Sequence, residues 1–120
     1  FTGVVSDREL LQKYYAAADL MVFPSVYDNA PLVVREAAAL GTPAILTKNS
    51  TAAEIIAENT NGFLTENNSI ALANKLKDLS KDRVYLHKIG INASQTIARS
   101  WENVVDEVLD RYKSIIKKYK

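Results

Sequence analysis

The sequence predicts an α/β fold: a Rossmann-like three-layer domain with a parallel sheet and a helical C-terminus. Two observations support this prediction. Three short apolar segments, residues 19–24, 42–47 and 61–66, show little alternation of polar and apolar residues, and helical patterns separate them. Unalternating strands are typical of sheets covered on both faces, and strands that alternate with helices are typical of parallel sheets. The chain of 120 residues has the size of one domain.

The first third of the chain predicts a strand, a helix and a second strand. Residues 1–5 are short and β-branched, which is typical of the end of a strand. Ser6 and Glu9 have the spacing of a capping box, which predicts that a helix begins there. The apolar stripe of this helix consists of Leu10, Leu11, Tyr14, Tyr15 and Ala18. The strand at 19–24 ends at Pro24, and we expect it to be the central strand of the sheet.

The middle of the chain continues this alternation. Pro31 suits the first turn of the next helix, where its missing N–H costs nothing. That helix is expected to end at Gly41, because glycine is the usual residue after a helix C-terminus. A strand at 42–47, a helix within 51–59 and a strand at 61–66 follow.

Beyond residue 68 the pattern is helical to the end of the chain. We expect helices at 69–80 and 82–98, and a third from Ser100 onward. One stripe of the third helix contains Trp101, Val104, Val105, Val108, Tyr112, Ile115 and Tyr119. We expect its three aromatic residues to pack in the core. The last turns concentrate basic residues: Arg111, Lys113, Lys117, Lys118 and Lys120. The helix dipole explains most of that charge, and an anionic membrane surface is the alternative.

Composition excludes several classes of function. The net charge is +1, with 15 basic and 14 acidic residues, so no global field favours nucleic acid. The absence of cysteine excludes disulfides and thiol nucleophiles. No signal peptide and no apolar run near eighteen residues occur, so the sequence predicts no membrane span. His87, the single histidine, is expected on the surface, and no metal-ligand cluster is recognisable.

Two carboxylates, Asp28 and Glu36, stand out at the predicted edge of the sheet. In open parallel sheets, ligands bind at the carboxyl ends of the strands. Asp28 lies in the loop after the strand at 19–24, and Glu36 lies about 7 Å along the following helix from Pro31. If Val33, Ala37 and Leu40 form the buried face of that helix, Glu36 lies at its margin and is partly desolvated.

The residues alone leave two interpretations of Glu36. It is a salt-bridge partner, with Arg35 or Lys48, or it accepts hydrogen bonds from the vicinal hydroxyls of a ribose. A partly desolvated carboxylate needs one or the other, because burial without a partner is costly. In the second interpretation Asp28 contacts a sugar further out, and the helix N-terminus suits a phosphate. No G-x-G-x-x-G or Walker loop occurs, which disfavours a generic dinucleotide or ATP site.

Several blocks of the sequence together resemble a known family. The segments "YAAADLMVFPSVYDNAPLVVREAAALGTPAI", "AAEII", "NGFL" and "SWENV" are similar to the C-terminal half of family 4 glycosyltransferases (glycosyl transferases group 1) of the GT-B fold. The resemblance covers nearly the whole chain and keeps the order and spacing of every block. That family has two glutamates separated by seven residues, and here Asp28 and Glu36 have this separation.

The resemblance implies a role for each residue of the site. Glu36 would bind the ribose of a nucleotide-sugar donor, and Asp28 would lie beside the transferred sugar as the catalytic residue. Backbone groups of the intervening segment would meet the sugar hydroxyls and the diphosphate; its residues are Asn29, Ala30, Pro31, Leu32 and Val33. Val5 marks the segment where the nucleobase would be held. Glu54 matches a family acidic residue, and a helix-capping role is the alternative.

Two departures from the family's pattern affect the site. Asp28 is one methylene shorter than the usual glutamate, which alters its reach. The common Gly-Phe-Gly loop is replaced by Asn29, Ala30 and Pro31, and proline has no N–H to donate. The family's basic phosphate-binding residues and its acceptor-binding domain lie upstream of the matching segment.

The resemblance implies the donor-binding half of a retaining, metal-independent hexosyltransferase without cofactors. The chain starts at Phe1 without a methionine, and we expect it to be one nucleotide-sugar-binding domain, residues 1–120, of a longer protein. The donor would be a UDP-, GDP- or ADP-sugar. A missing N-terminal domain would hold the acceptor, a sugar or a lipid. We expect a cytoplasmic protein, and peripheral association with the inner face of the membrane is compatible with its basic C-terminus.

Two other classes of function remain as alternatives. A receiver-like interaction module would need a phosphorylatable aspartate at the end of an apolar strand, but the segment "LMVFPS" ends in proline and serine. A sugar-nucleotide epimerase of the same architecture would need histidine and acidic pairs that the sequence does not contain.

Overall fold

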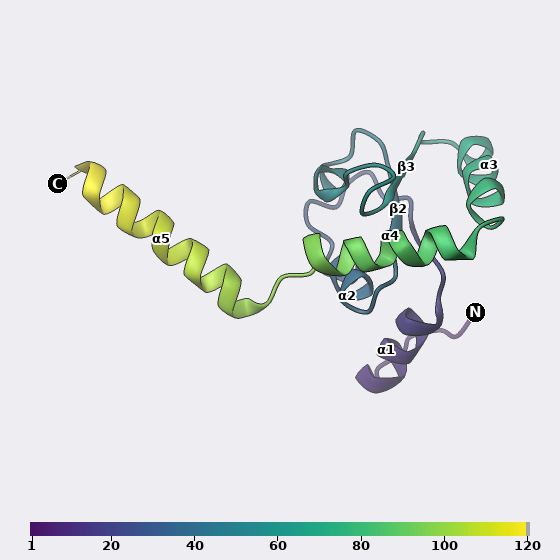
Figure 1. The fold of residues 1–120 in the computed structure, drawn as a ribbon, viewed down its shortest axis with the longest axis horizontal. Coiled ribbons are helices and arrows are strands. Elements are labelled where there is room, and N and C mark those ends of the chain that lie inside the picture. The colour runs from purple at the N-terminus through teal and green to yellow at the C-terminus, as the bar shows by residue number, and fades with distance from the viewer. Residues whose placement is uncertain (120) are drawn as a thin grey trace.

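The computed structural model describes residues 1–119. Its elements, in chain order, are α1 (Arg8–Ala17), β1 (Met21–Phe23), α2 (Leu32–Ala39), β2 (Ala44–Thr47), the 3-10 helix η1 (Thr51–Ile55), β3 (Phe63–Thr65), α3 (Ser69–Leu79), α4 (Arg83–Thr96) and α5 (Trp101–Tyr119). Figure 1 shows the sheet between the helices. Helix α1, near the N-terminus, lies below the sheet, and α5, at the C-terminal end, extends away from it.

The three strands form a parallel sheet in the order β1-β2-β3. Val22 lies opposite Ile45, and Leu46 lies opposite Leu64. The predicted α/β class and parallel pairing are therefore confirmed, and the described chain beyond residue 69 is helical, as expected. The expected central position of the strand at 19–24 is wrong: β2 is central and β1 lies at an edge.

The error about β1 has a physical cause in the segment that precedes α1. Residues 1–5 were expected to end a strand, but residues 1–7 form neither helix nor strand here. No strand among the described residues therefore pairs with the outer edge of β1. Val22 is 42% exposed in consequence, although the apolar run had predicted a strand buried on both faces.

Two apolar clusters cover the two faces of the sheet, which gives the three-layer arrangement. The first joins Ala44 and Leu46 of β2 to α2, η1 and the C-terminal part of α4. The second joins Ile45 and Phe63 to α3 and the N-terminal part of α4. Neighbouring residues of β2 point to opposite faces, and all four are buried. This explains why the strand lacks alternation.

The helix ends differ slightly from their predicted positions. The N-cap of α1 is Asp7, one residue after Ser6, and its side chain accepts hydrogen bonds from the backbone N–H groups of Glu9 and Leu10. Pro31 is the N-cap of α2 rather than its first residue. Gly41 follows α2 with a φ of 79°, the left-handed conformation that favours glycine. Residues 51–55 form the 3-10 helix η1, capped by Ser50, instead of a longer helix.

Helix α4 crosses very close to the segment between α2 and β2. Gly90 is buried at the crossing, and a Cβ atom built there would lie 1.9 Å from the carbonyl oxygen of Gly41. No side chain fits in that space. Glycine is therefore required for α4 to approach residues 41–43 this closely.

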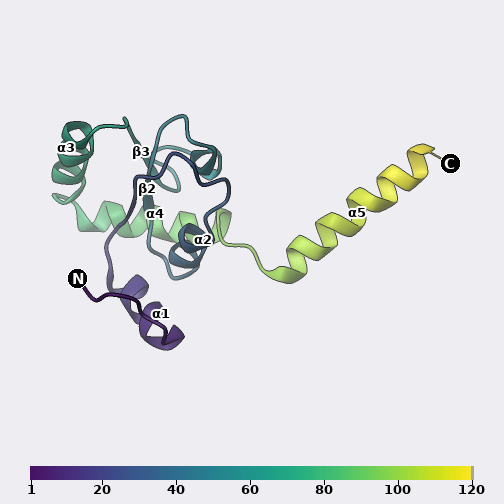
Figure 2. The same ribbon diagram turned by 180° about the vertical axis from the view of Figure 1, so that it is seen from behind.

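Helix α5 extends away from the rest of the molecule (Figures 1 and 2). No residue of α5 is buried, and Trp101, Tyr112 and Tyr119 are exposed, so the prediction that they pack in the core is wrong within residues 1–119. The radius of gyration is 16.5 Å, above the value of about 14 Å typical of a compact chain of this length. None of the helices described here combines the length and apolar character that a membrane crossing requires.

Candidate functional site

A groove of about 450 Å³ lies between α1 and α2 and contains Glu36. The α1 side chains that line it belong to one helix face, with i, i+3, i+4 and i+7 spacing: Arg8, Leu11, Gln12 and Tyr15. From α2, the groove is lined by Glu36 and Ala39, and by the C-cap residue Leu40. Val5 and Ser6, which precede α1, complete the lining. This volume lies within the range of about 300–1,000 Å³ that is typical of small-molecule sites.

Glu36 occupies a face of α2 that the sheet does not cover. The buried residues of α2 are Val34, Ala37 and Ala38, whereas Leu40 is exposed, so the predicted face of Val33, Ala37 and Leu40 is wrong in part. With about 100° per residue, Glu36 lies roughly 200° around the helix from Val34. Its side chain is exposed and not partly desolvated as expected. Glu36 faces the groove and not the core.

The two predicted salt-bridge partners of Glu36 are engaged elsewhere. The Nη1 atom of Arg35 donates a hydrogen bond to the carbonyl oxygen of Ile97 at 2.8 Å. The Nζ atom of Lys48 lies 3.1 Å from a carboxylate oxygen of Glu66, and this hydrogen bond raises the pKa of Lys48. Within residues 1–119, no salt bridge holds Glu36. The salt-bridge interpretation therefore lacks its expected partners.

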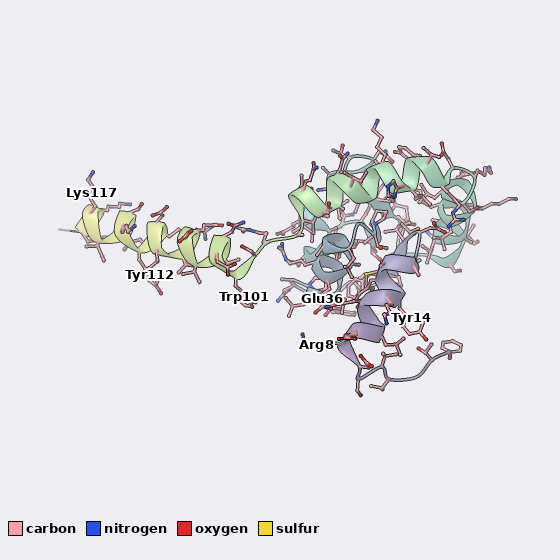
Figure 3. The ribbon with its side chains drawn as sticks, turned by 60° about the horizontal axis from the view of Figure 1, so that its bottom comes forward. Arg8, Tyr14, Glu36, Trp101, Tyr112 and Lys117 are labelled. Atoms are coloured by element: carbon pink, nitrogen blue, oxygen red, sulfur yellow. The ribbon has the colours of Figure 1, made fainter. Side chains whose placement is uncertain are left out.

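Tyr15 and Arg8 add polar groups from α1 to the groove. Burial, and secondarily the negative charge of Glu36, raise the pKa of the Tyr15 hydroxyl. Both side chains line the same groove. Figure 3 shows Arg8 and Glu36 on the same side of α1, with Tyr14 on the other side. The groove therefore combines one acidic, one basic and one phenolic side chain.

The backbone holds α1 against the rest of the molecule at its C-terminal end. The Oγ1 atom of Thr42 donates a hydrogen bond to the carbonyl oxygen of Tyr15 at 2.5 Å. Thr42 is buried and directly precedes the segment that enters β2. Because α1 itself has no buried residue, this bond is an important fixed point for the α1 wall of the groove.

Asp28 lies outside the groove, in the loop between β1 and α2. Its Oδ2 atom accepts a hydrogen bond from the Oγ atom of Ser25 at 2.5 Å, and its side chain is exposed. Asp28 does not line the groove that Glu36 lines. The structure of these residues alone therefore does not bring the two carboxylates into one cavity.

The remaining predicted site residues, 29–33, form the end of that loop and the start of α2. Asn29, Ala30 and Leu32 are exposed, Pro31 is buried and Val33 packs against the core. Pro31 provides no side-chain hydrogen bond as the N-cap of α2. The first backbone N–H groups of α2 thus have no capping side chain, and such groups commonly bind anions.

A second, smaller hollow of about 220 Å³ lies where the three strands end. It is lined by Pro24, Thr47 and Thr65, which end or follow β1, β2 and β3, and by residues around the N-cap of α3, Asn68. Across the described part of the chain, no three metal-ligating side chains lie close enough together to hold an ion. His87 is exposed, as predicted, and Glu54 is exposed on η1, which Ser50 caps.

Sequence reasoning missed most of the α1 wall of the groove. Arg8 and Gln12 were assigned no role, and Leu11 and Tyr15 were assigned to the apolar stripe of α1. The available signal was the i, i+4, i+7 spacing of Arg8, Gln12 and Tyr15, which puts three polar groups on one helix face. It was masked because the apolar stripe of α1 shares Leu11 and Tyr15 with that face.

Comparison with known proteins gives consistent matches. Residues 1–96 match the family model of glycosyl transferases group 1. An uncharacterized glycosyltransferase of Methanocaldococcus jannaschii is 32% identical over 116 residues, which are 94% of this chain and 30% of that protein. The chain thus spans less than a third of the length of this relative.

Two solved structures resemble the chain over most of its length. Sucrose-phosphate synthase from Thermosynechococcus elongatus aligns with a TM-score of 0.80 and 30% identity, over 98% of this chain and 30% of that one. Anabaena HepE in complex with UDP-glucose aligns with a TM-score of 0.68 and 27% identity, over 85% of this chain and 29% of that one.

Proposed function

The chain belongs to the glycosyl transferases group 1 family, and on that basis we propose that it is the nucleotide-sugar-binding domain of a longer glycosyltransferase. Membership of the family supports transfer of a sugar as the reaction class. It favours transfer over both alternatives, a receiver-like interaction module and a sugar-nucleotide epimerase. The chain supplies one wall of the active site, and the acceptor, a sugar or a lipid, is held mainly by another domain.

The observation that carries the proposal is the position of Glu36 in the groove between α1 and α2. Glu36 and Val5 were assigned to the ribose and the nucleobase on sequence grounds, and both line this groove. A carboxylate on an uncovered helix face, with no salt-bridge partner within the described residues, is free to accept hydrogen bonds from ribose hydroxyls. The similar protein HepE was solved with UDP-glucose, which supports a nucleotide sugar as the ligand.

The loop from Asp28 to Val33 would hold the diphosphate and the transferred sugar. The uncapped N-terminus of α2 favours negative charge, since its N–H groups and the helix dipole both attract anions. The amides of Leu32 and Val33 are the donors, because Pro31 has none. Asn29 and Ala30 contribute backbone groups, and Asp28 lies beside the sugar as the catalytic carboxylate. Its hydrogen bond from Ser25 fixes its orientation.

The finer properties of the reaction follow from the family resemblance. We propose transfer with retention of anomeric configuration, without a metal ion, from a UDP-, GDP- or ADP-sugar. The protein would act in the cytoplasm, and its basic C-terminal turns allow peripheral contact with the inner face of the membrane.

Substitution of Glu36 by glutamine in the full-length protein tests the proposal. Glu36→Gln keeps the shape but removes the charge and one acceptor oxygen. Each charge-assisted hydrogen bond contributes about 1.5–3 kcal/mol, so binding of a nucleoside diphosphate should weaken at least tenfold. Because Glu36 is exposed, the melting temperature should stay within about 2 °C. Isothermal titration calorimetry with UDP, GDP and ADP, beside thermal melts, measures both effects.

The matched control is Asp106→Asn, which removes an exposed carboxylate on α5, far from the groove. It should leave the affinity unchanged. If Glu36→Gln binds the diphosphate as tightly as the original protein, the ribose role of Glu36 is wrong. A lowered melting temperature with unchanged affinity would instead support the salt-bridge interpretation.

A further inference from the structure

Tyr15 is a polar group of the groove to which no role has been given. Its side chain is half-buried and lines the groove from α1, opposite Glu36 on α2. Its neighbour Tyr14 is 46% exposed and does not line the groove. The two tyrosines therefore differ in environment although they are adjacent in sequence.

The backbone of Tyr15 is fixed while its hydroxyl is free. Its carbonyl oxygen accepts hydrogen bonds from the Oγ1 atom of Thr42 at 2.5 Å and from the N–H of Ala18 at 3.1 Å. Within residues 1–119, the Tyr15 hydroxyl makes no hydrogen bond to a protein group. A phenol with an unused O–H is a hydrogen-bond donor that is available to an acceptor in the groove.

Glu36 is the carboxylate that lines the same groove as this donor. The two residues line it from two different helices, and the charge of Glu36 contributes to the raised pKa of Tyr15. In Glu36, two oxygens offer about four lone-pair positions, and two ribose hydroxyls would use only part of them. An exposed glutamate on a helix also samples several rotamers, and an internal donor would restrict these to the one that faces the ribose.

We propose that Tyr15 is a positioning residue for Glu36: when a nucleotide binds, the phenolic O–H donates to the carboxylate a hydrogen bond that the present structure does not contain, and orients the carboxylate toward the ribose. The inference rests on the proposed function, because it gives Tyr15 a role only through the ribose contact of Glu36. Tyr15 does not take part in the transfer of the sugar.

The test uses Tyr15→Phe in the full-length protein, with Tyr14→Phe as the matched control. The ligands are whichever of UDP, GDP and ADP binds the unchanged protein, and the 2′,3′-dideoxy analogue of that diphosphate, which lacks the ribose hydroxyls. Because Tyr15 acts on the ribose only through the orientation of Glu36, Tyr15→Phe should raise the Kd of the diphosphate about three- to tenfold, less than the loss of a direct charge-assisted hydrogen bond. The Kd of the dideoxy analogue should change less than twofold, and Tyr14→Phe should change neither value.

A double variant separates this inference from the proposed function. If Tyr15 acts through Glu36, adding Tyr15→Phe to Glu36→Gln should raise the Kd of the diphosphate less than twofold further. Three results would each overturn the positioning role. They are a double variant whose increase in Kd is the product of the two single increases, an equal increase in Kd for the diphosphate and its dideoxy analogue in Tyr15→Phe, and an unchanged Kd in Tyr15→Phe. An unchanged Kd in Glu36→Gln would overturn the proposed function itself, and the role of Tyr15 with it.

Discussion

Glu36 shows at the level of one residue how a polar side chain can sit in an otherwise apolar helix. The buried face of α2 consists of small or branched apolar residues, and Glu36 belongs to a different face, with Ala39 and Leu40. The helix therefore packs on the sheet without burying a charge, which would be costly. Its second face remains available for a ligand, and this separation lets one short helix serve both stability and binding.

Gly90 lies where the packing leaves no space for any side chain. Alanine would favour a helix interior by about 1 kcal/mol relative to glycine, but the new Cβ would lie 1.9 Å from a backbone oxygen of Gly41. We expect Gly90→Ala to lower the free energy of unfolding by about 2–3 kcal/mol, because α4 must move away from residues 41–43. Urea denaturation of the chain measures the change.

The control for this prediction is Gln95→Ala, an exposed position on the same helix. It should change the free energy of unfolding by less than about 0.5 kcal/mol. A Gly90→Ala variant as stable as the original chain would contradict the close approach of α4 to this segment.

Among the elements, α4 and α5 contribute very differently to the fold. Helix α4 supplies residues to both apolar clusters. Ala93 and the C-cap residue Ile97 belong to the first cluster, and Leu86 and Ile89 belong to the second. Helix α5 buries none of its residues, although its apolar stripe is regular. Arg99 and Arg111 both pair with Glu107 and lower its pKa. Such exposed pairs order the start of α5 but add little stability.

Removal of residues 100–120 should therefore leave the rest of the chain folded. We expect the melting temperature to change by less than about 3 °C, because no buried surface of the sheet or of α4 is lost. The radius of gyration, measured by small-angle X-ray scattering, should fall from 16.5 Å to about 13 Å.

A longer deletion provides the comparison for this truncation. Removal of residues 92–120 also deletes Ala93 and Ile97 from the first apolar cluster and should abolish the cooperative transition. Loss of the transition in the shorter deletion would contradict the independence of the core from α5.

The whole molecule presents one wall of a two-substrate site. The groove with Glu36 is lined by α1, by the second half of α2 and by residues 5, 6 and 40, and the loop with Asp28 does not line it. The chain also covers only about 30% of the length of its relatives. Holding two reactants in register accounts for much of enzymatic rate acceleration, and this requires groups from both sides.

We therefore expect no sugar transfer by the 120-residue chain alone. Incubation with UDP-, GDP- and ADP-sugars and a panel of acceptors should give no product above the rate without protein, whereas the full-length parent should give product. Transfer by the isolated chain would contradict this expectation. Hydrolysis of the donor without an acceptor should be measured in parallel, because it would indicate a catalytic site that is already complete.

The sequence by itself determined the fold class, the parallel pairing, the helical C-terminal half and the two carboxylates of interest. Unalternating strands such as Ala44–Thr47 and the stops at Pro24 and Gly41 are local signals, and local signals are readable without neighbours. The family resemblance was equally local, since it rested on motif order and spacing.

The tertiary structure alone decided which faces are covered. The sequence of α2 is apolar nearly all round, so its pattern could not distinguish the face on the sheet from the face with Glu36. In α5 the apolar stripe is present, but none of the described residues covers it, so Trp101 and Tyr119 are exposed. The edge position of β1 and the groove wall with Arg8 and Tyr15 likewise depend on which elements meet. Burial is a property of pairs of surfaces, and a one-dimensional pattern records only one member of each pair.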